Sequence, residues 1–283
     1  MFKSTSRRFF LLTPLLGTQG ALYARFVEPE WLEFSERSCR LPGVTREFSL
    51  VHLSDLHASK DVPQPLIERA IQMAVDAKPD VICLTGDFVT SARDFDPRWY
   101  MRVLAKLAST APTFAVLGNH DGGLWAANSG GFATTRHVAR MIEGSGVQLL
   151  GNRSVRLSCK GGIVQLVGVG DMWARELNGA AAFREAQPGL PTVLLSHNPD
   201  SKDLLGSFDW HLMLSGHTHG GQVVLPVLGL NPAPVKDRRY TEGLKPWRNR
   251  WIHVSRGVGS IKGIRFNCRP ELTRLKIGTE VIS

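Results

Sequence analysis

The sequence predicts an α/β fold in which a second, mixed β-sheet packs on the first. In the first half of the chain, short β-rich runs alternate with amphipathic helical segments, a pattern typical of βαβ units with mostly parallel strands. In the second half, predicted strands follow one another with little helix between them, which favours a second sheet. The 283 residues, 43% of them hydrophobic, suffice for one large domain with a sizeable core.

Four amphipathic segments are expected to form the helices. Residues 65–78 carry apolar side chains at i, i+3 and i+4 spacing, with Pro65 in the first turn, where proline is tolerated. Similar patterns predict helices over 98–109, 134–146 and about 176–186. The β-rich runs predict strands at 48–53, 80–85, 113–118, 147–150, 153–158, 163–169, 192–196, 211–215, 222–225, 251–255 and 272–277.

The longest irregular stretch, residues 226–250, is rich in Pro, Gly, Arg and Trp. A loop of that length in a compact domain is usually functional or disordered. Because it directly follows the histidine-rich segment Leu214–Gln222, we expect it to serve a functional site.

The first 26 residues resemble an export signal and are not expected to join the fold. Adjacent Arg7 and Arg8, followed by an apolar segment, match the bacterial twin-arginine pattern S-R-R-x-F-L. That segment is short for a membrane span and no A-x-A cleavage site follows it, so an uncleaved anchor is the alternative. The chain then divides into 1–26 as signal or anchor, 27–46 as linker and 47–283 as the domain. We expect export to the periplasm or anchoring to the inner membrane, with the cytoplasmic face as the alternative.

The net charge of +9 and the sequence pI of about 9.7 favour anionic partners such as phosphates, nucleic acid or a membrane surface. A solvated basic surface is the alternative, since the arginines are spread over the whole chain. No basic stripe with interleaved aromatics indicates specific nucleic-acid binding, and no feature indicates an obligate protein partner. The four cysteines form no zinc motif; Cys83 is expected in the core, and disulfides stay open.

Polar clusters follow five of the predicted strands. In an open α/β sheet the carboxyl ends of parallel strands share one edge, where ligands bind. We therefore expect these side chains to line one crevice, where they offer carboxylates, imidazoles and an amide but no thiolate. They are Asp55, His57, Asp87, Asn119, His120, Asp121, His197, Asn198, His217 and His219.

The order of these motifs resembles that of the calcineurin-like metallophosphoesterase superfamily. D-x-H, G-D, G-N-H-D, a single H and G-H-x-H each follow a strand, and the resemblance covers about residues 47–283. The segments SHNPDS, DRRYTEG and the C-terminal tail further resemble a bacterial phosphodiesterase branch of it. The resemblance implies a four-layer α-β-β-α sandwich, with two packed mixed β-sheets flanked by helices.

It also implies a centre with two divalent cations. Asp55, His57, Asp87 and His219 would hold one cation, and Asp87, Asn119, His197 and His217 the other. Asp87 would bridge them, and a metal-bridging hydroxide would attack phosphorus in line. Oxygen and nitrogen ligands without thiolate suit Mn, Fe, Zn, Co or Ni better than Ca.

His120 corresponds to the family's catalytic histidine, which would protonate the leaving oxygen or stabilise its charge. In protein phosphatases of the superfamily, an aspartate three residues after the G-D aspartate orients this histidine. Here that position is Thr90, which argues against a protein phosphatase and leaves the orientation of His120 open. Asp121 is a candidate partner, with a turn role as the alternative.

Three arginines are candidate substrate-binding residues, namely Arg238, Arg239 and Arg265. They lie in segments that resemble the bacterial branch, and guanidinium groups suit phosphate oxygens; surface or structural roles are the alternative. Trp125 and Trp173 follow strand ends. We expect them to pack in the core, with a wall for an apolar leaving group as the alternative.

The expected function is hydrolysis of a phosphodiester. The alternative within enzymes is a pyrophosphatase acting on UDP-2,3-diacylglucosamine, a nucleotide-lipid precursor of lipid A, which would need an apolar groove beside the metals. A non-catalytic scaffold would normally have lost some metal ligands, whereas all seven ligand positions are filled here.

Overall fold

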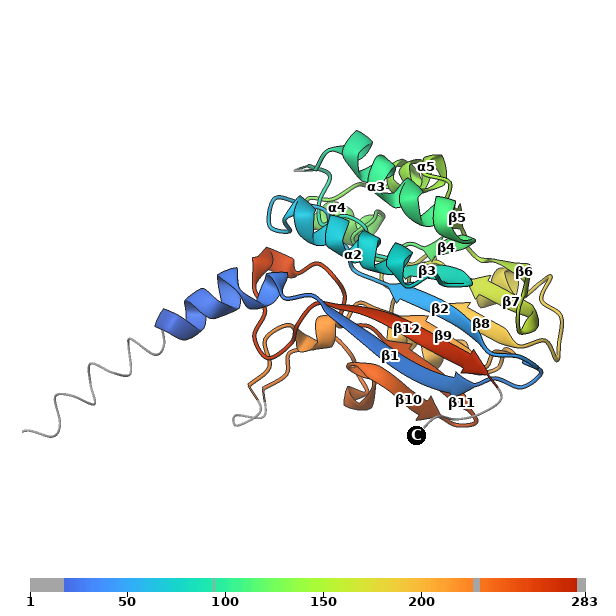
Figure 1. The fold of residues 1–283 in the computed structure, drawn as a ribbon. Coiled ribbons are helices and arrows are strands. Elements are labelled where there is room, and N and C mark those ends of the chain that lie inside the picture. Colours follow the sequence, from blue (N-terminus) through green and yellow to red (C-terminus); the bar gives the residue numbers. More distant parts are fainter. Residues whose placement is uncertain (1–17, 94, 226–229, 279–283) are drawn as a thin grey trace, which may run out of the picture.

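Two six-stranded β-sheets pack face to face, and helices cover the outer face of the first (Figure 1). The structure is a computed structural model that describes residues 18–93, 95–225 and 230–278. It confirms the α/β architecture of two packed mixed sheets expected from the sequence.

The first sheet is mixed and carries the first half of the metal motifs. Strands β2 to β5 run parallel, and antiparallel β12 separates them from β1. In spatial order the sheet consists of β1 (Glu33–Arg40), β12 (Glu271–Gly278), β2 (Phe48–Leu53), β3 (Val81–Thr85), β4 (Thr113–Val116) and β5 (Gln148–Leu149).

Three helices pack on its outer face: α2 (Gln64–Asp76), α3 (Pro97–Thr110) and α5 (Arg136–Gly144). They match the predicted segments to within a few residues. Helix α3 begins where it does because the Asp96 carboxylate accepts a hydrogen bond from the backbone N–H of Arg98, at 2.9 Å. A short helix, α4 (Leu124–Asn128), was not predicted.

The second sheet is parallel in its centre, with antiparallel strands at both edges. Its outer face is covered by short helical turns such as α6 (Gly179–Ala182) and η5 (Arg238–Tyr240), so the fourth layer is thin. In spatial order the sheet consists of β10 (Gly243–Trp247), β11 (Arg250–Val254), β9 (Leu212–Ser215), β8 (Thr192–Leu195), β7 (Gly162–Gly168) and β6 (Arg153–Cys159).

Alternate side chains of each strand enter different apolar layers. Leu50 and Cys83 point between the two sheets, where they join Leu195 of the second sheet. Their chain neighbours Val51 and Ile82 point to the helices. This period of two is the geometry of a pleated strand buried on both faces. All four cysteines lie in the described part of the chain and are free.

Several sequence predictions are corrected. The expected linker 27–46 contains β1, which pairs in parallel with β12. Because β1 lies at a sheet edge, its sequence EFSERSCR is charged and lacks the apolar pattern by which a strand is predicted. The irregular stretch 226–250 contains β10 and the first residue of β11. The run 222–225 forms only isolated bridges. The helix expected near 176–186 is the four-residue α6, which starts at its Asn178 cap.

Part of the N-terminal segment set apart from the fold packs on the domain. Residues 18–26 are helical, and the carbonyl oxygen of Ala24 accepts a hydrogen bond from the N–H of Arg265 at 2.9 Å. Within the described ranges, no helix combines the length and apolar character needed to cross a bilayer. Arg7 and Arg8 lie outside the described residues.

Candidate metal centre

The loops that follow five strands bring the predicted ligands to one edge of the sandwich. The first sheet supplies them after β2, β3 and β4, and the second after β8 and β9. The ligand atoms form two groups, in each of which all atoms lie within 4.8 Å of one another. The groups are Asp55, His57, Asp87 and His219, and Asp87, His197 and His217.

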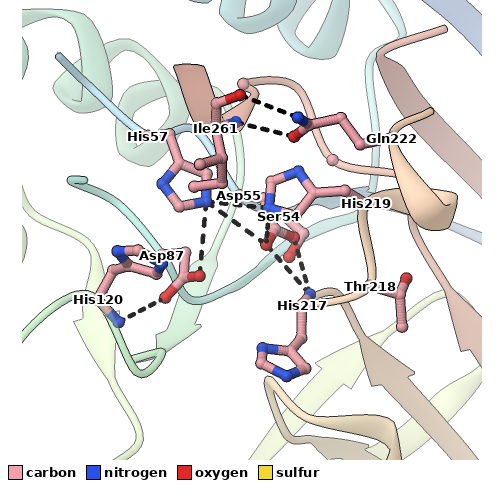
Figure 2. Close-up of polar contacts among 12 residues, drawn as sticks. Ser54, Asp55, His57, Asp87, His120, His217, Thr218, His219, Gln222 and Ile261 are labelled. Atoms are coloured by element: carbon pink, nitrogen blue, oxygen red, sulfur yellow. Dashed lines mark hydrogen bonds and ion pairs between the residues drawn. The ribbon is translucent and has the colours of Figure 1, made fainter. Parts of the chain in front are cut away.

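Asp87 belongs to both groups, as the sequence predicts for a bridging ligand. Its Oδ2 atom lies 3.5 Å from Nε2 of His57 in the first group and 3.1 Å from Nε2 of His197 in the second. Figure 2 shows the Asp87 carboxylate beside His57. A single carboxylate therefore reaches imidazoles of both groups.

The spacing of the first group is that of atoms around a common cation. Nε2 of His57 and Nε2 of His219 are 3.1 Å apart, and Oδ1 of Asp55 is 3.4 Å from the latter (Figure 2). Ligand atoms each about 2.0–2.2 Å from one metal ion lie about 3 Å from their neighbours. Burial lowers the pKa of His57 to about 3 and that of His219 well below its ordinary value, so both imidazoles are neutral and offer lone pairs.

The second group contains buried polar atoms without a partner. The amide Oδ1 of Asn119 and Nε2 of His217 have no hydrogen bond among the described residues. A buried polar atom left unsatisfied costs about 1–3 kcal/mol. Burial also lowers the pKa of His217 to about 3, which leaves this ring neutral. Both atoms fit the role of ligands to a cation at Asp87.

Charges at the centre need a positive partner. Burial raises the pKa of Asp55 to about 7. Burial works in the same direction on Asp87, yet the neighbouring imidazole of His197 holds the pKa of Asp87 well below the ordinary value. Conversely, burial works to lower the pKa of His197, but Asp87 raises it well above the ordinary value. A bound cation would take over the charge compensation that protonated His197 gives Asp87.

The backbone at the ligands adopts a conformation that non-glycine residues rarely take. Such left-handed residues cost about 1–3 kcal/mol each and persist at sites where the surrounding structure holds them. Five of the seven predicted ligands have a positive φ angle, namely Asp55, His57, Asp87, His217 and His219. The strain is concentrated where the ligands converge, which is typical of a functional site.

Two glycines let the ligand loops approach one another. Gly86 has φ +79°, and a Cβ atom there would lie 2.6 Å from the backbone nitrogen of Gly118 in the neighbouring loop. A Cβ on Gly216 would overlap Ser54 and the carboxylate of Asp55. The glycines in the G-D and G-H-x-H motifs are therefore needed for space between loops.

Contacts behind the ligands fix the imidazole rings. Nδ1 of His197 donates to the carbonyl oxygen of Thr85 at 2.7 Å, and Nδ1 of His57 lies 3.1 Å from the hydroxyl of Thr90. In each ring the opposite nitrogen, Nε2, is thereby directed to the ligand group. Such partners set the tautomer and orientation of metal-binding histidines. The backbone N–H of His217 donates to the Asp55 carboxylate at 3.1 Å while its ring points away toward the second group (Figure 2).

His120 lies beside the centre but belongs to neither ligand group. Its backbone N–H donates to Oδ1 of Asp87 at 2.9 Å (Figure 2). Its ring atom Nδ1 lies 3.1 Å from the carbonyl oxygen of Thr90. The residue that replaces the aspartate of protein phosphatases thus still orients the histidine, through its backbone.

Asp121 has the turn role that was one of its two predicted alternatives. Its Oδ1 accepts from the N–H groups of Phe88 and Val89, at 2.7 and 3.2 Å, and its Oδ2 from that of Gly118 at 2.9 Å. The carboxylate therefore ties the loop after β3 to the loop after β4 and has no contact that would orient His120.

A cavity of about 660 Å³ opens over the centre, and Asp87, Asn119 and His217 contribute to its lining. Trp125 and Trp173 form part of its wall, and both are half-buried. The Trp125 ring lies 4.5 Å from that of His120, and the Trp173 ring 4.3 Å from that of His217. The expectation that both tryptophans pack in the core is wrong, since they stand against the site.

Another part of the cavity wall comes from the irregular stretch 226–250, as the sequence analysis expects, and from residues that it did not assign to the site. Val223, Pro232, Pro234 and Ile261 line it. The side-chain amide of Gln222 holds Ile261 by two hydrogen bonds, of 2.9 Å from its Nε2 to the carbonyl oxygen and 2.8 Å from the N–H to its Oε1 (Figure 2). For Ile261 the only sequence signal was the polar Gln222 directly after the Gly-Gly of the last motif.

The predicted substrate arginines do not reach this cavity. Arg265 is completely buried, and its guanidinium group donates to the backbone carbonyls of Arg256, Gly257, Gly259 and Cys268. Its predicted substrate role is corrected to a structural one, because the group has no access to solvent.

Arg238 and Arg239 line a separate hollow of about 560 Å³ together with Lys245. The Arg239 guanidinium is paired with the Asp237 carboxylate. These two arginines are therefore exposed to solvent but lie outside the cavity over the metal ligands.

Known proteins resemble the chain over most of its length. The family described as calcineurin-like phosphoesterase matches residues 48–221. Phosphodiesterase YaeI of Escherichia coli (strain K12) is 37% identical over 276 residues, which are 96% of this chain and 99% of YaeI. The metallophosphoesterase YkuE of Bacillus subtilis (strain 168) is 29% identical, and the alignment covers 96% of this chain and 97% of YkuE. UDP-2,3-diacylglucosamine pyrophosphatase LpxG of Chlamydia trachomatis is 27% identical, over 90% of this chain and 92% of LpxG.

Proposed function

This chain belongs to the calcineurin-like phosphoesterase family, and from that premise we propose that it is a phosphodiesterase that uses two divalent cations. The observation that carries the proposal is the position of Asp87 in both ligand groups. A shared carboxylate can hold two cations about 3.5–4 Å apart. The oxygen and nitrogen donors suit Mn, Fe, Zn, Co or Ni.

The residues divide the chemistry between them. Cations at the two groups would supply an activated water and offset the charge that develops on the phosphoryl oxygens. Asp87 and the neutral imidazoles hold those cations at the floor of the cavity. The Nδ1–H of His120 donates to the Thr90 carbonyl, so the proton that the ring gives to the leaving oxygen is the second one, on Nε2 of its imidazolium form.

Replacement of Asp87 by asparagine tests the two-cation proposal. The neutral amide removes the charge that both groups share, so Asp87→Asn is expected to lower the bound metal from two ions per chain and to abolish nearly all hydrolysis of bis-nitrophenyl phosphate. Elemental analysis gives the metal content. Asp61→Asn, which changes another carboxylate at the cavity, is the control and should keep both ions. Two ions and normal turnover in Asp87→Asn would contradict the proposal.

A second candidate is pyrophosphatase activity on a UDP-linked lipid. It is favoured by the apolar wall of Val223, Pro232, Pro234 and Ile261 beside the metal ligands, which could accommodate an acyl chain. The similarity to LpxG agrees with this candidate.

Competition between the two substrates distinguishes the candidates. If the lipid is the substrate, UDP-2,3-diacylglucosamine should be cleaved to UMP and the lipid phosphate, and should inhibit cleavage of bis-nitrophenyl phosphate with an inhibition constant equal to its KM. UDP-N-acetylglucosamine, which lacks the long acyl chains, is the control. Failure to cleave or compete with the lipid substrate leaves the simple phosphodiesterase as the function.

A further inference from the structure

The helix at residues 18–26 has one face on the domain and one in solvent. Its inner side is held by Tyr23, whose ring contacts that of Phe266 edge to face at 6.2 Å, and by the Arg25 guanidinium, which donates to the carbonyl oxygen of Gly263 at 3.1 Å. Just after the helix, the buried Glu28 carboxylate accepts hydrogen bonds from the N–H groups of Asn267 and Cys268. These contacts make the helix an integral part of the fold.

The outer side of this segment is apolar. Leu22 and Phe26, four residues apart on the helix, are 52% and 63% exposed, and the following Val27 and Trp31 are 49% and 52% exposed. Ile264, in the loop that holds the helix, is 36% exposed. We call these five side chains the N-terminal apolar face. Large exposed apolar patches on soluble proteins mark interaction sites.

Cationic side chains surround the N-terminal apolar face. Arg25 and Lys262 are exposed, and the Arg269 guanidinium lies 4.3 Å from the Trp31 ring. Arg69 donates to the carbonyl oxygen of Glu30, itself an exposed acid in this region. Arg269 also pairs with the partly exposed Glu33 carboxylate at 3.6 Å. Four cations therefore accompany two acids around the face, and the excess of positive charge matches the anionic headgroups of a phospholipid surface.

The same loops connect this face to the cavity. Ile261 and Lys262 line the cavity. They directly precede Gly263, which binds Arg25 of the helix, and Ile264, which belongs to the apolar face. Val223, another lining residue, forms a β-bridge with Phe266. In Figure 1 the C-terminal end of the blue helix lies beside the orange-red loop that contains residues 261–263, where Arg25 binds Gly263. A surface that binds the apolar face would lie beside the mouth of the cavity.

We propose that the N-terminal apolar face lies on an anionic phospholipid surface, with the helix parallel to that surface and the cavity opening beside it. Interfacial helices bind in this way, with apolar side chains in the headgroup boundary and cations at its edge. The sequence before the helix has the same character, with Lys3, Arg7 and Arg8 and apolar residues between positions 9 and 16. The proposal does not depend on the substrate.

Vesicle flotation with the full chain tests the proposal. The protein is expected to float with vesicles of phosphatidylethanolamine and phosphatidylglycerol, less so in high salt, and much less with phosphatidylcholine alone. Leu22→Glu/Phe26→Glu should weaken partitioning at least about tenfold, because two apolar side chains no longer enter the boundary. Ile163→Glu changes a side chain that is equally exposed, at 54%, but lies on β7, and it should float like the wild type.

Three results would overturn the proposal. The wild-type protein would not float with the anionic vesicles, the double variant would float as well as the wild type, or Ile163→Glu would lose as much vesicle binding as the double variant. Hydrolysis of bis-nitrophenyl phosphate and the Tm of the double variant report whether it has folded. If it has not, brominated lipids decide instead. They should quench less of the fluorescence in Trp31→Phe than in the wild type, and equal quenching in the two proteins would count against the face.

Discussion

At the scale of single residues, the proposed mechanism assigns metal binding and proton transfer to two neighbours in the chain. The neighbours are Asn119 and His120. Asn119 has a buried amide oxygen without a hydrogen-bond partner, while His120 is held by Asp87 and Thr90 and belongs to neither ligand group. Adjacent side chains on an extended segment point in different directions. One short motif can thus serve the metals and the leaving group at once.

His120→Ala is expected to keep both cations and to slow hydrolysis according to the leaving group. An alkoxide needs a proton as the P–O bond breaks, whereas a nitrophenolate needs little help. General acid catalysis contributes about 10²–10⁴-fold, so an alkyl diester should lose about that factor and a nitrophenyl diester distinctly less. Turnover on both substrates and elemental analysis check this.

Two outcomes would assign His120 differently. Equal losses on both diesters with metal retained would mean that the imidazole stabilises the phosphoryl oxygens. Loss of metal would make it a ligand. Trp125→Phe, which keeps an aromatic ring against His120, is the control for simple disturbance of the cavity wall.

At the scale of elements, the centre depends on how closely the loops after β2 and β9 approach one another. These strands belong to different sheets, and Gly216 lies where a Cβ would overlap Ser54 and the Asp55 carboxylate. The backbone at Gly216 does not have a positive φ angle, so alanine there would act through its volume alone. The loop junction is therefore a sensitive test of the metal centre.

Gly216→Ala is expected to displace Asp55 and to weaken metal binding, with a loss of stability of about 1–3 kcal/mol, the usual cost of overpacking. Metal content after dialysis and thermal unfolding measure the two effects. Gly151→Ala is the matched control, because a Cβ there meets no atom within 4 Å. A Gly216→Ala protein with normal metal affinity would show that the loops can move apart without losing the site.

At the scale of the whole molecule, the centre joins the two sheets. Asp55, His57, Asp87 and Asn119 follow strands of the first sheet, while the other three ligands follow strands of the second. A second polar contact also crosses between the sheets, since Nδ1 of His52 on β2 lies 2.9 Å from Nδ1 of His253 on β11. The ligands converge only when both sheets have formed and packed.

A protein whose ligands come from both sheets is suited to a route that exports folded chains. We propose that Arg7 and Arg8 form a twin-arginine signal, which lies outside the described residues. Arg7→Lys/Arg8→Lys should retain the protein in the cytoplasm, as measured by cell fractionation. Arg238→Lys/Arg239→Lys changes another adjacent pair and should leave its location unchanged. Unaltered periplasmic or membrane accumulation of the first variant would show that its arginines are incidental.

The sequence by itself determined the α/β class and the main parallel strands, and it placed the candidate ligands at one edge of the sheet. Hydrophobic periodicity is a local property, and residues 48–53, 80–85 and 113–118 carry it clearly. The ends of parallel strands necessarily meet at one edge, so Asp55, Asp87 and their companions could be brought together without coordinates. The order of the five motifs was enough to indicate the family.

Only the tertiary structure decided the features that depend on partners far away in the chain. Strand β1 pairs with β12, more than 230 residues later, and its charged sequence has no periodicity to reveal this. Arg265 looks like a phosphate ligand until four backbone carbonyls enclose its guanidinium. Thr90 orients His120 through a backbone carbonyl, a group that every residue has. In each case the deciding contact is between distant segments, and side-chain type alone does not encode it.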